Sequence, residues 1–339
     1  MKKRILLVAV VQLFLTLNSC SSDSGDNTKD PVVIAGEIKA DYIADVSLAD
    51  DFVIDNNNIV YKIGQEDITV KLKKIDLEGK ISVLKILDFT SFYASALSIT
   101  KEGTVLLVAP SNEADRDKIF RFENNFTVLN PFYTMKPISS PFANKIRLSA
   151  IGDNKDNTYF VFDYNNRQIK RFVPELSTDV LVAGSEKKAI EDGTGLNASF
   201  GSVSKIVSQN NILYVIDNLY TGANPVFVSS NIRKLEYVNN EWVVSTLISN
   251  STNKYLDIAF DPKNELYVLV ENKGIAKLNL QNNTLSVFKD GDLLVGKETV
   301  HKKSSYKNIT MMKIKDNDLY IILDYDLVKI SDFQSKLSK

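Results

Sequence analysis

Four glycines fall within one short stretch of the chain, and this clustering raises the question of a phosphate-binding loop. The stretch reads LVAGSEKKAIEDGTGLNASFGSV over 181–203, in a chain that has only 14 glycines among its 339 residues. A P-loop has a lysine directly after its last glycine, followed by serine or threonine. Here Leu196 follows Gly195, and no helix pattern follows that would complete a dinucleotide-binding unit. The glycines therefore predict a chain path that needs positive φ values, and not a nucleotide site.

Other residue types that carry catalysis are scarce. The chain has one cysteine, Cys20, and one histidine, His301, which stands in a lysine-rich stretch. A single histidine cannot build a multi-histidine zinc site or a histidine-based triad, and no G-x-S-x-G is present. Carboxylates and amides that bind calcium are plentiful, but no spacing selects a set of them. We therefore expect no catalytic residue, no metal and no cofactor.

Acidic residues at regular spacing are a second arrangement that chemistry could use. Asp163, Asp217 and Asp324 each end an apolar segment, and together they could form a ring of metal ligands. Aspartate at the end of a strand also caps turns by accepting backbone N–H hydrogen bonds. Because their spacing follows a repeat of the chain, we favour capping over metal binding.

That repeat has a period of about fifty residues. The segments NTYFVFD, NILYVID, ELYVLVE and DLYIILD place tyrosines at Tyr159, Tyr214, Tyr267 and Tyr320. Two earlier segments, GTVLLVA and NNIVYKI, extend the series to six units. Each unit contains a strand, a polar turn, the tyrosine strand, an alternating strand and often a fourth strand. This pattern predicts an all-β fold, a six-bladed β-propeller of four-stranded blades, with seven blades as the alternative.

The last repeat unit lacks a fourth strand, and an extra strand-like segment precedes the first unit. The sixth unit stops after its third strand, while PVVIAGEIKA at 31–40 is a strand-like segment left over before the first unit. An open ring would leave unpaired strand edges. We predict that residues 32–39 pair as the outer strand of the last blade, so that one propeller spans 32–339.

The opening stretch resembles the signature of NHL-repeat propellers, A-G-x(n)-D-G-x-G-x-x-A-x-F followed by L-Y-V-x-D and I-R-K. The chain matches it with Ala183-Gly184, with 192–200, with 213–217 and with Ile232-Arg233-Lys234. The resemblance is strong over 147–248, weaker over 250–332 and only topological over 43–130. It implies that 181–203 is a connector between blades. The residues that would shape the connector are Gly184, Asp192, Gly193, Gly195 and Phe200.

The N-terminus has the pattern of a lipoprotein signal. Basic residues at 2–4 precede an apolar run over 5–17, which ends in Leu17-Asn18-Ser19-Cys20. This resembles a bacterial lipobox and predicts a signal peptide over 1–19, a lipid on Cys20 and a polar tether over 20–31. The serine- and aspartate-rich start resembles Bacteroidetes lipoproteins. We expect a cell-envelope protein held at the outer membrane by that lipid, with the periplasmic or surface face left open.

Charge gives no case for a nucleic-acid partner. Removal of the signal peptide leaves 38 basic against 42 acidic residues, a mildly negative chain. Some eukaryotic NHL propellers bind RNA through a basic face, but a secreted, mildly acidic chain does not favour that function.

Long loops concentrate on one predicted face, where the hairpins between second and third strands meet the connectors. They are 110–117, 129–145, 218–230 and 289–305. Long loops on one face of a rigid scaffold commonly carry binding. We predict a non-enzymatic binding or scaffold propeller for an envelope protein or a glycan; the alternative is a calcium-dependent lactonase or a lyase-type propeller enzyme. The predicted contacts are Asp115, Arg116, Phe132, Tyr133, Tyr220 and Phe227. Trp242 lies on a predicted outer strand and is expected to serve blade packing.

Overall fold

The computed structural model describes most of the chain after residue 37. The described ranges are 38–47, 49–67, 69–87, 96–108, 115–123, 125–136, 146–154, 157–176, 178–288, 292–297 and 300–337. The predicted signal peptide, Cys20 and the tether lie outside the described residues. Among the described helices, none is both long enough and apolar enough to cross a membrane.

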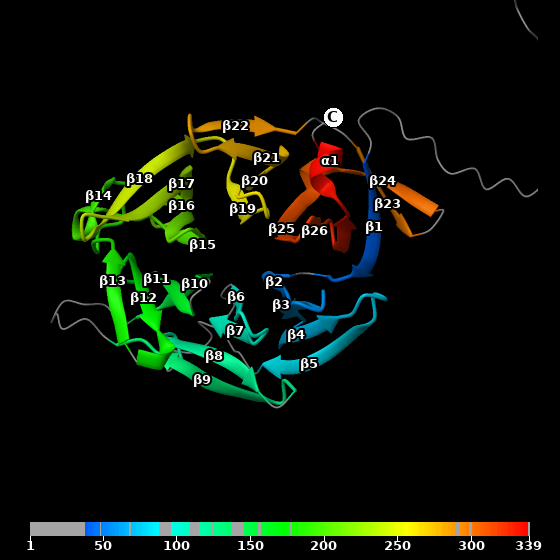
Figure 1. Ribbon diagram of the computed structural model, residues 1–339, viewed down its shortest axis with the longest axis horizontal. Helices are drawn as coiled ribbons and strands as arrows, with labels where there is room; N and C mark the ends of the chain where they lie inside the picture. The colour runs from blue at the N-terminus through cyan, green and yellow to red at the C-terminus, as the bar shows by residue number, and fades with distance from the viewer. Residues whose placement is uncertain are drawn as a thin grey trace, which may run out of the picture. The chain divides into compact units, whose positions relative to one another are not determined.

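The described strands form six sheets arranged as blades around one axis (Figure 1). Blade 1 contains β2 (Asp51–Ile54), β3 (Val60–Glu66), β4 (Thr69–Ile75) and β5 (Ile81–Leu87). Blade 2 contains β6 (Ala96–Ile99), β7 (Val105–Val108), β8 (Lys118–Glu123) and β9 (Val128–Thr134). Blade 3 contains β10 (Leu148–Asn154), β11 (Thr158–Asp163), β12 (Gln168–Val173) and β13 (Thr178–Ala183).

The other three blades complete the ring and confirm the six-bladed prediction. Blade 4 contains β15 (Val203–Gln209), β16 (Ile212–Thr221), β17 (Val226–Val238) and β18 (Glu241–Asn250), with the short β14 (Gly193–Thr194) on its outer edge. Blade 5 contains β19 (Tyr255–Phe260), β20 (Leu266–Val270), β21 (Gly274–Asn279) and β22 (Thr284–Val287). Blade 6 contains β25 (Ile309–Lys315), β26 (Asp318–Leu323) and β27 (Asp326–Ile330).

The second strand of each blade explains the apolar segments of the repeat. All residues of β7, β11 and β20 are buried, because a second strand is covered by neighbouring blades on both faces of its sheet. Strands buried on both faces consist of continuous hydrophobic residues rather than alternating ones. The strand register also refines the repeat. Phe160, and not Tyr159, pairs like Tyr214, since each faces a basic residue of the third strand, Arg171 or Lys234.

The tight turns explain why so few glycines suffice. Among the described residues, seventeen other than glycine have positive φ, and fourteen of these are asparagine or aspartate. Their short polar side chains tolerate the left-handed region better than other non-glycine residues. The chain thus builds most of its turns with asparagine and uses glycine where a close approach requires it.

An N-terminal strand closes the ring, as predicted, but it lies later in the chain than expected. The strand β1 (Ile38–Asp45) pairs antiparallel with β27 and becomes the fourth strand of blade 6. The prediction had placed it at 32–39, and residues 32–37 lie outside the described residues. The reason is that Tyr42 and Ala44 supply the apolar side that faces the blade.

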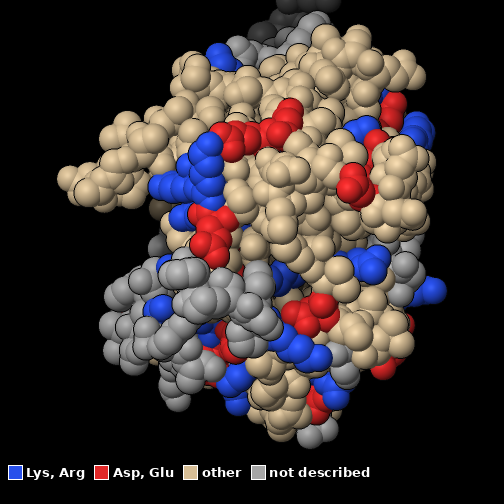
Figure 2. All heavy atoms as spheres, turned by 90° about the vertical axis from the view of Figure 1, so that its left-hand side faces the viewer, with Lys and Arg blue, Asp and Glu red and all other residues tan. Residues whose placement is uncertain are grey.

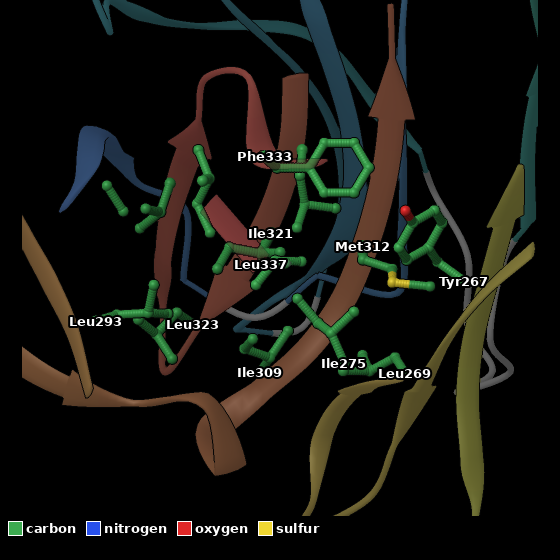
Figure 3. Packing of buried hydrophobic residues seen from close by; sticks show 14 of the residues in the cluster. Tyr267, Leu269, Ile275, Leu293, Ile309, Met312, Ile321, Leu323, Phe333 and Leu337 are labelled. Carbon is green, nitrogen blue, oxygen red and sulfur yellow. The ribbon is translucent and has the colours of Figure 1, made fainter. Parts of the chain in front are cut away.

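Two elements of this region were not predicted as such. The connector at 289–305 forms a hairpin of β23 (Asp292–Lys297) and β24 (Val300–Ser305), and β23 pairs in parallel with β1. The chain ends in a short helix, α1 (Phe333–Leu337), where only a missing strand had been expected. Figure 3 shows Phe333 and Leu337 of this helix among the buried side chains of blades 5 and 6. The ring of Phe333 meets that of Tyr267 edge to face, with 5.1 Å between centroids.

Candidate functional site

The acidic residues that follow the apolar segments of the repeat accept hydrogen bonds near the point where the chain passes from a connector into the inner strand. The carboxylate of Asp163 accepts a hydrogen bond from the Arg147 N–H at 3.1 Å, and that of Asp217 accepts one from the Ser202 N–H at 2.9 Å. Both carboxylates therefore accept backbone N–H hydrogen bonds, as predicted, but at Asp217 the donors belong to the connector and not to the hairpin that follows. Asp324 differs, because the register places it one residue later and its carboxylate accepts the Ser304 hydroxyl at 3.4 Å.

The glycine-rich stretch lies in the segment between β13 and β15 and folds back on itself. The Gly184 N–H donates to the Gly195 carbonyl at 3.1 Å, and the Ser185 N–H donates to the Ala198 carbonyl at 2.9 Å. Gly184 has φ of +111°, and a Cβ there would collide with the carbonyl oxygen of Arg167. Gly193 begins β14, which pairs with β18. These contacts fix the backbone conformation of the connector.

A buried arginine fixes this connector to blade 4. Arg233 is fully buried, and its Nη1 donates to the Asp217 carboxylate at 3.0 Å. Its Nη2 donates to the Glu191 carbonyl at 2.6 Å and to the Asp192 carboxylate at 3.1 Å. The guanidinium also lies over the ring of Phe200, 4.7 Å from its centroid. The signature residues Asp192, Asp217 and Arg233 thus form one network with the connector backbone.

Four charged side chains meet on the axis, and sequence reasoning missed all of them. Lys205 of blade 4 crosses the axis to Asp51 of the opposite blade 1, with 2.9 Å between Nζ and Oδ1. Lys313 of blade 6 lies 3.5 Å from Asp51 and 3.4 Å from Asp257 of blade 5. Asp51, Lys205 and Asp257 occupy equivalent strand positions, nine or ten residues before the repeat tyrosine. Aligning the units on that tyrosine would have placed these three residues at one position of the inner strand, but it would not have shown that Lys205 pairs with Asp51.

The four charges stabilise one another. Burial alone would raise the pKa of the Asp51 carboxyl, but the ammonium groups of Lys205 and Lys313 outweigh burial and lower that pKa. Burial alone would lower the pKa of Lys205, but the carboxylates of Asp257 and Asp51 outweigh it and raise that pKa. Asp51 also accepts a hydrogen bond from the Leu97 N–H of blade 2 at 3.0 Å. The cluster therefore links inner strands on several sides of the axis.

The axial cavity measures about 260 Å³ and is lined by residues of all six inner strands. Calcium sites need six to eight oxygen ligands. Here two carboxylates face two ammonium groups, a donor set that does not suit a divalent cation. Among the described residues, no group of three or more histidine, cysteine, aspartate or glutamate side chains is placed to hold a metal.

The upper face is defined here as the face that carries the connectors and the hairpins between second and third strands. In blade 4 this hairpin is much longer than in its neighbours, since β16 has 10 and β17 has 13 residues against 6 in both β11 and β12. Its tip, residues 218–230, is called the arm. The arm contains no charged residue. Figure 2 shows an arm without blue or red atoms projecting at the level of blade 4.

Two predicted contact residues meet on the arm. Tyr220 pairs with Phe227 across the hairpin, with 5.9 Å between the ring centroids. The Lys254 ammonium lies 5.9 Å from the Tyr220 centroid and 5.7 Å from that of Phe227. Val226 keeps 64% of its surface exposed. The two rings and the lysine hold the hairpin in one shape while the valine faces solvent.

Two further predicted contacts lie in the corresponding hairpin of blade 2. Asp115 and Arg116 occupy the turn before β8, and Asp115 forms an ion pair with Lys118 at 2.7 Å. That hydrogen bond is the main reason why the pKa of Lys118 is raised. The structure thus places this pair on the upper face, two blades from the arm, and does not bring it together with Tyr220.

The last two predicted contacts belong to packing between blades 2 and 3. Phe132 and Tyr133 had been assigned to a connector loop, but they lie on β9, because the strand extends to Thr134. Tyr133 is buried, stacks on Phe172 at 4.8 Å and donates its hydroxyl to Asp179 at 3.1 Å. Phe132 meets Phe172 edge to face at 6.4 Å. Both rings therefore pack between the two blades and are not placed to contact a partner.

The single tryptophan behaves as predicted. Trp242 lies on the outer strand β18 and meets Phe160 of blade 3 at 6.0 Å between ring centroids. His301 lies on β24, at a position paired with Gly296 of β23. No site gathers around the tryptophan among the described residues.

No protein-family model and no curated protein matches this sequence. Solved structures match in fold. An auxiliary nutrient binding protein from Bacteroides thetaiotaomicron aligns with a TM-score of 0.56 and 13% identity, over 84% of this chain and 69% of that chain. A protein of unknown function from the same organism aligns with a TM-score of 0.53 and 13% identity, over 90% and 72%.

Enzymes also appear among the similar structures. Virginiamycin B lyase from Staphylococcus aureus aligns with a TM-score of 0.49 and 13% identity, over 82% of this chain and 92% of that chain. At this similarity the comparisons establish the propeller fold alone.

Proposed function

We propose that this chain is a non-enzymatic, NHL-like binding propeller of the cell envelope, and that its arm docks a partner protein. The observation that carries this proposal is the arm itself. It is uncharged over 218–230, extends beyond its blade and exposes Val226 and Val228 to solvent at 64% and 38%. Exposed apolar groups that gather on a projecting element are characteristic of protein interaction sites.

The shape of the arm favours binding. Tyr220, Phe227 and Lys254 contact one another and hold the hairpin before any partner arrives. A preorganised element loses less conformational entropy on binding than a flexible loop. Asn218 pairs with Ser230 and Leu219 pairs with Ser229, so the strand pairing of blade 4 continues into the arm.

A protein partner fits the arm better than a glycan. Carbohydrates are commonly held on exposed aromatic faces. Here the two rings meet edge to face and are half-buried, whereas the most exposed apolar side chain of the arm is Val226. A glycan remains the second partner to be tested.

The axial cluster supports a binding function over a catalytic one. A calcium-dependent lactonase would need free oxygen ligands on the axis. Asp51 and Asp257 are both engaged by lysines there. One similar fold belongs to an auxiliary nutrient binding protein, which agrees with a binding module.

The anchor belongs to the same proposal. The LNSC sequence at 17–20 would place a lipid on Cys20 and hold the propeller at the outer membrane. Cells expressing the chain should incorporate labelled palmitate, and Cys20→Ala should abolish the label. Equal labelling of both proteins would contradict the anchor while leaving the binding proposal intact.

The docking proposal is tested with a matched pair of variants. Tyr220→Ala with Phe227→Ala should weaken retention of an envelope protein at least about tenfold, as loss of a hot spot does. The control is Tyr325→Ala, which removes a solvent-facing tyrosine, 57% exposed, from the corresponding hairpin of blade 6. Equal retention by both variants would contradict the proposal. Retention of a glycan from an array, lost only in the arm variant, would assign the arm to carbohydrate.

A further inference from the structure

Basic side chains surround one tyrosine on the upper face of blade 3. Tyr164 directly follows β11. The guanidinium of Arg167 lies 4.1 Å from the centroid of its ring, and that of Arg147 lies 5.0 Å away. Burial alone would raise the pKa of the tyrosine, but a hydrogen bond from Arg167 and the charges of Arg167, Lys188 and Arg147 outweigh it and lower that pKa. Three cations thus act on a single phenol.

The conformation of Arg167 is unusual for an arginine. Its φ is +55°, in the region that asparagine and aspartate occupy at fourteen of the seventeen described non-glycine positions. Residues held in sparsely populated backbone regions are strained and gather at functional sites. The Nη1 group of Arg167 also donates to the Gly201 carbonyl at 2.5 Å. The guanidinium is therefore fixed in place beside Tyr164.

Two adjacent lysines lie next to this cluster and differ in their partners. Lys187 and Lys188 are adjacent and both exposed, but Lys187 forms an ion pair with Glu191. Lys188 forms no ion pair among the described residues. The nearby carboxylate of Asp163 is already engaged by Lys170 at 3.2 Å.

We propose that Arg147, Arg167, Lys188 and Tyr164 form an anion site that binds the carboxylates of an acidic segment of the partner protein. A guanidinium matches a planar carboxylate with two parallel hydrogen bonds, and an adjacent ammonium adds a point charge. This inference rests on the proposed function, because the arm of the neighbouring blade 4 would hold the partner on the same upper face.

The surroundings favour an acidic peptide over an acidic sugar. Sugar rings stack on open aromatic faces, whereas the Tyr164 ring is already in contact with two guanidinium groups. The arm offers apolar contacts that suit a folded protein, and the basic cluster would complement acidic residues next to such a surface.

The experiment is a titration of the full-length lipidated protein in detergent with a hexaglutamate peptide at low salt. Lys188→Gln should weaken binding about three- to fivefold, as expected for an exposed charge pair. The matched control, Lys187→Gln, carries the same charge change one residue away and should leave affinity within about twofold. Added salt should weaken binding of the unaltered protein.

A second variant separates binding from folding. Arg167→Asn removes the guanidinium and places at φ of +55° a residue that suits it. It should keep the thermal midpoint and weaken peptide binding about tenfold or more, because charge-assisted hydrogen bonds are lost.

Three results would overturn the anion site: no binding of hexaglutamate, equal losses in Lys187→Gln and Lys188→Gln, or preference for a glucuronate oligosaccharide over the peptide. If the arm variants lose the partner while these variants do not, the proposed function holds and only the anion site fails. If Lys188→Gln lowers peptide binding but the arm variants keep the partner, the docking proposal fails.

Discussion

Two regions of blade 4 differ in where they place charged and apolar side chains: the part next to the connector, called the foot, and the arm, called the tip. At the foot, Arg233 and Asp217 are both fully buried and pair with each other at 3.0 Å. At the tip, the arm has no charge and exposes Val226 and Val228. The two regions lie on the same two strands, β16 and β17, so their difference is one of purpose rather than of local structure.

The contrast separates residues that stabilise the fold from residues that are exposed to a partner. A buried ion pair is seldom the most stable way to fill an interior, but removal of one partner is strongly destabilising. In blades 5 and 6, Ala276 and Val328 occupy the strand position of Arg233 and build their part of the fold without charge. Arg233 is thus needed to hold the glycine-rich connector. The apolar arm is needed neither for the connector nor for the rest of the fold.

Substitution Arg233→Met should give the largest loss of stability. It leaves Asp217 buried without its cation and the Glu191 carbonyl without a donor. We expect the free energy of unfolding to fall by about 3–5 kcal/mol, measured by urea denaturation. The adjacent control, Lys234→Met, removes a half-buried lysine and should change it by less than about 1 kcal/mol. A similar loss in both variants would contradict the structural role of the buried arginine.

Substitution Lys205→Met on the axis should have an intermediate effect. Lys313 remains within 3.5 Å of Asp51, so we expect a loss of about 1–3 kcal/mol at pH 7. Asp51 has a lowered pKa in the folded protein, so its contribution is complete above the unfolded pKa and is lost as pH falls through the folded value.

The pH dependence of this variant follows from that sign. Without Lys205 the pKa of Asp51 is depressed less, and less stability is left to lose in acid. The difference in unfolding free energy between Lys205→Met and the unaltered chain should therefore shrink between pH 5 and pH 3. A difference that grows or stays constant in this interval would exclude the axial ion pair as its source.

Removal of the two aromatic side chains of the arm should have the smallest effect on stability. Tyr220→Ala together with Phe227→Ala removes one edge-to-face contact and the ring contacts of Lys254. Such contacts at partly exposed sites contribute about 1 kcal/mol. Thermal unfolding should therefore shift by only a few degrees. A loss as large as that of Arg233→Met would make the arm part of the structural framework.

The architecture could be predicted because the repeat is visible in the sequence. Apolar second strands recur about every fifty residues, and unpaired strand edges predict that the ring closes. The closing strand was predicted too early in the chain, at 32–39 instead of 38–45, because both segments are apolar enough to pair. The hairpin at 292–305 escaped prediction because its pairing with β1 joins segments some 250 residues apart.

The candidate sites were predictable to different degrees. Tyr220 and Phe227 stood out because the insertion around them is long. Phe132 and Tyr133 were misplaced because three prolines nearby, over 129–145, suggested a loop, although β9 runs through the first of them. The axial pair of Lys205 and Asp51 arises from opposite blades, and no local pattern records such a contact.

Crosslinking in living cells tests most directly the central claim that the arm meets the partner protein. A photoreactive phenylalanine would replace Phe227 in one strain and Tyr325 in another, with adducts identified by mass spectrometry. We expect one discrete protein adduct from position 227 and no such adduct from position 325. Combining Arg167→Asn with Lys188→Gln should reduce or abolish the adduct from position 227. No adduct from 227, or the same adducts from both positions, would contradict the central claim.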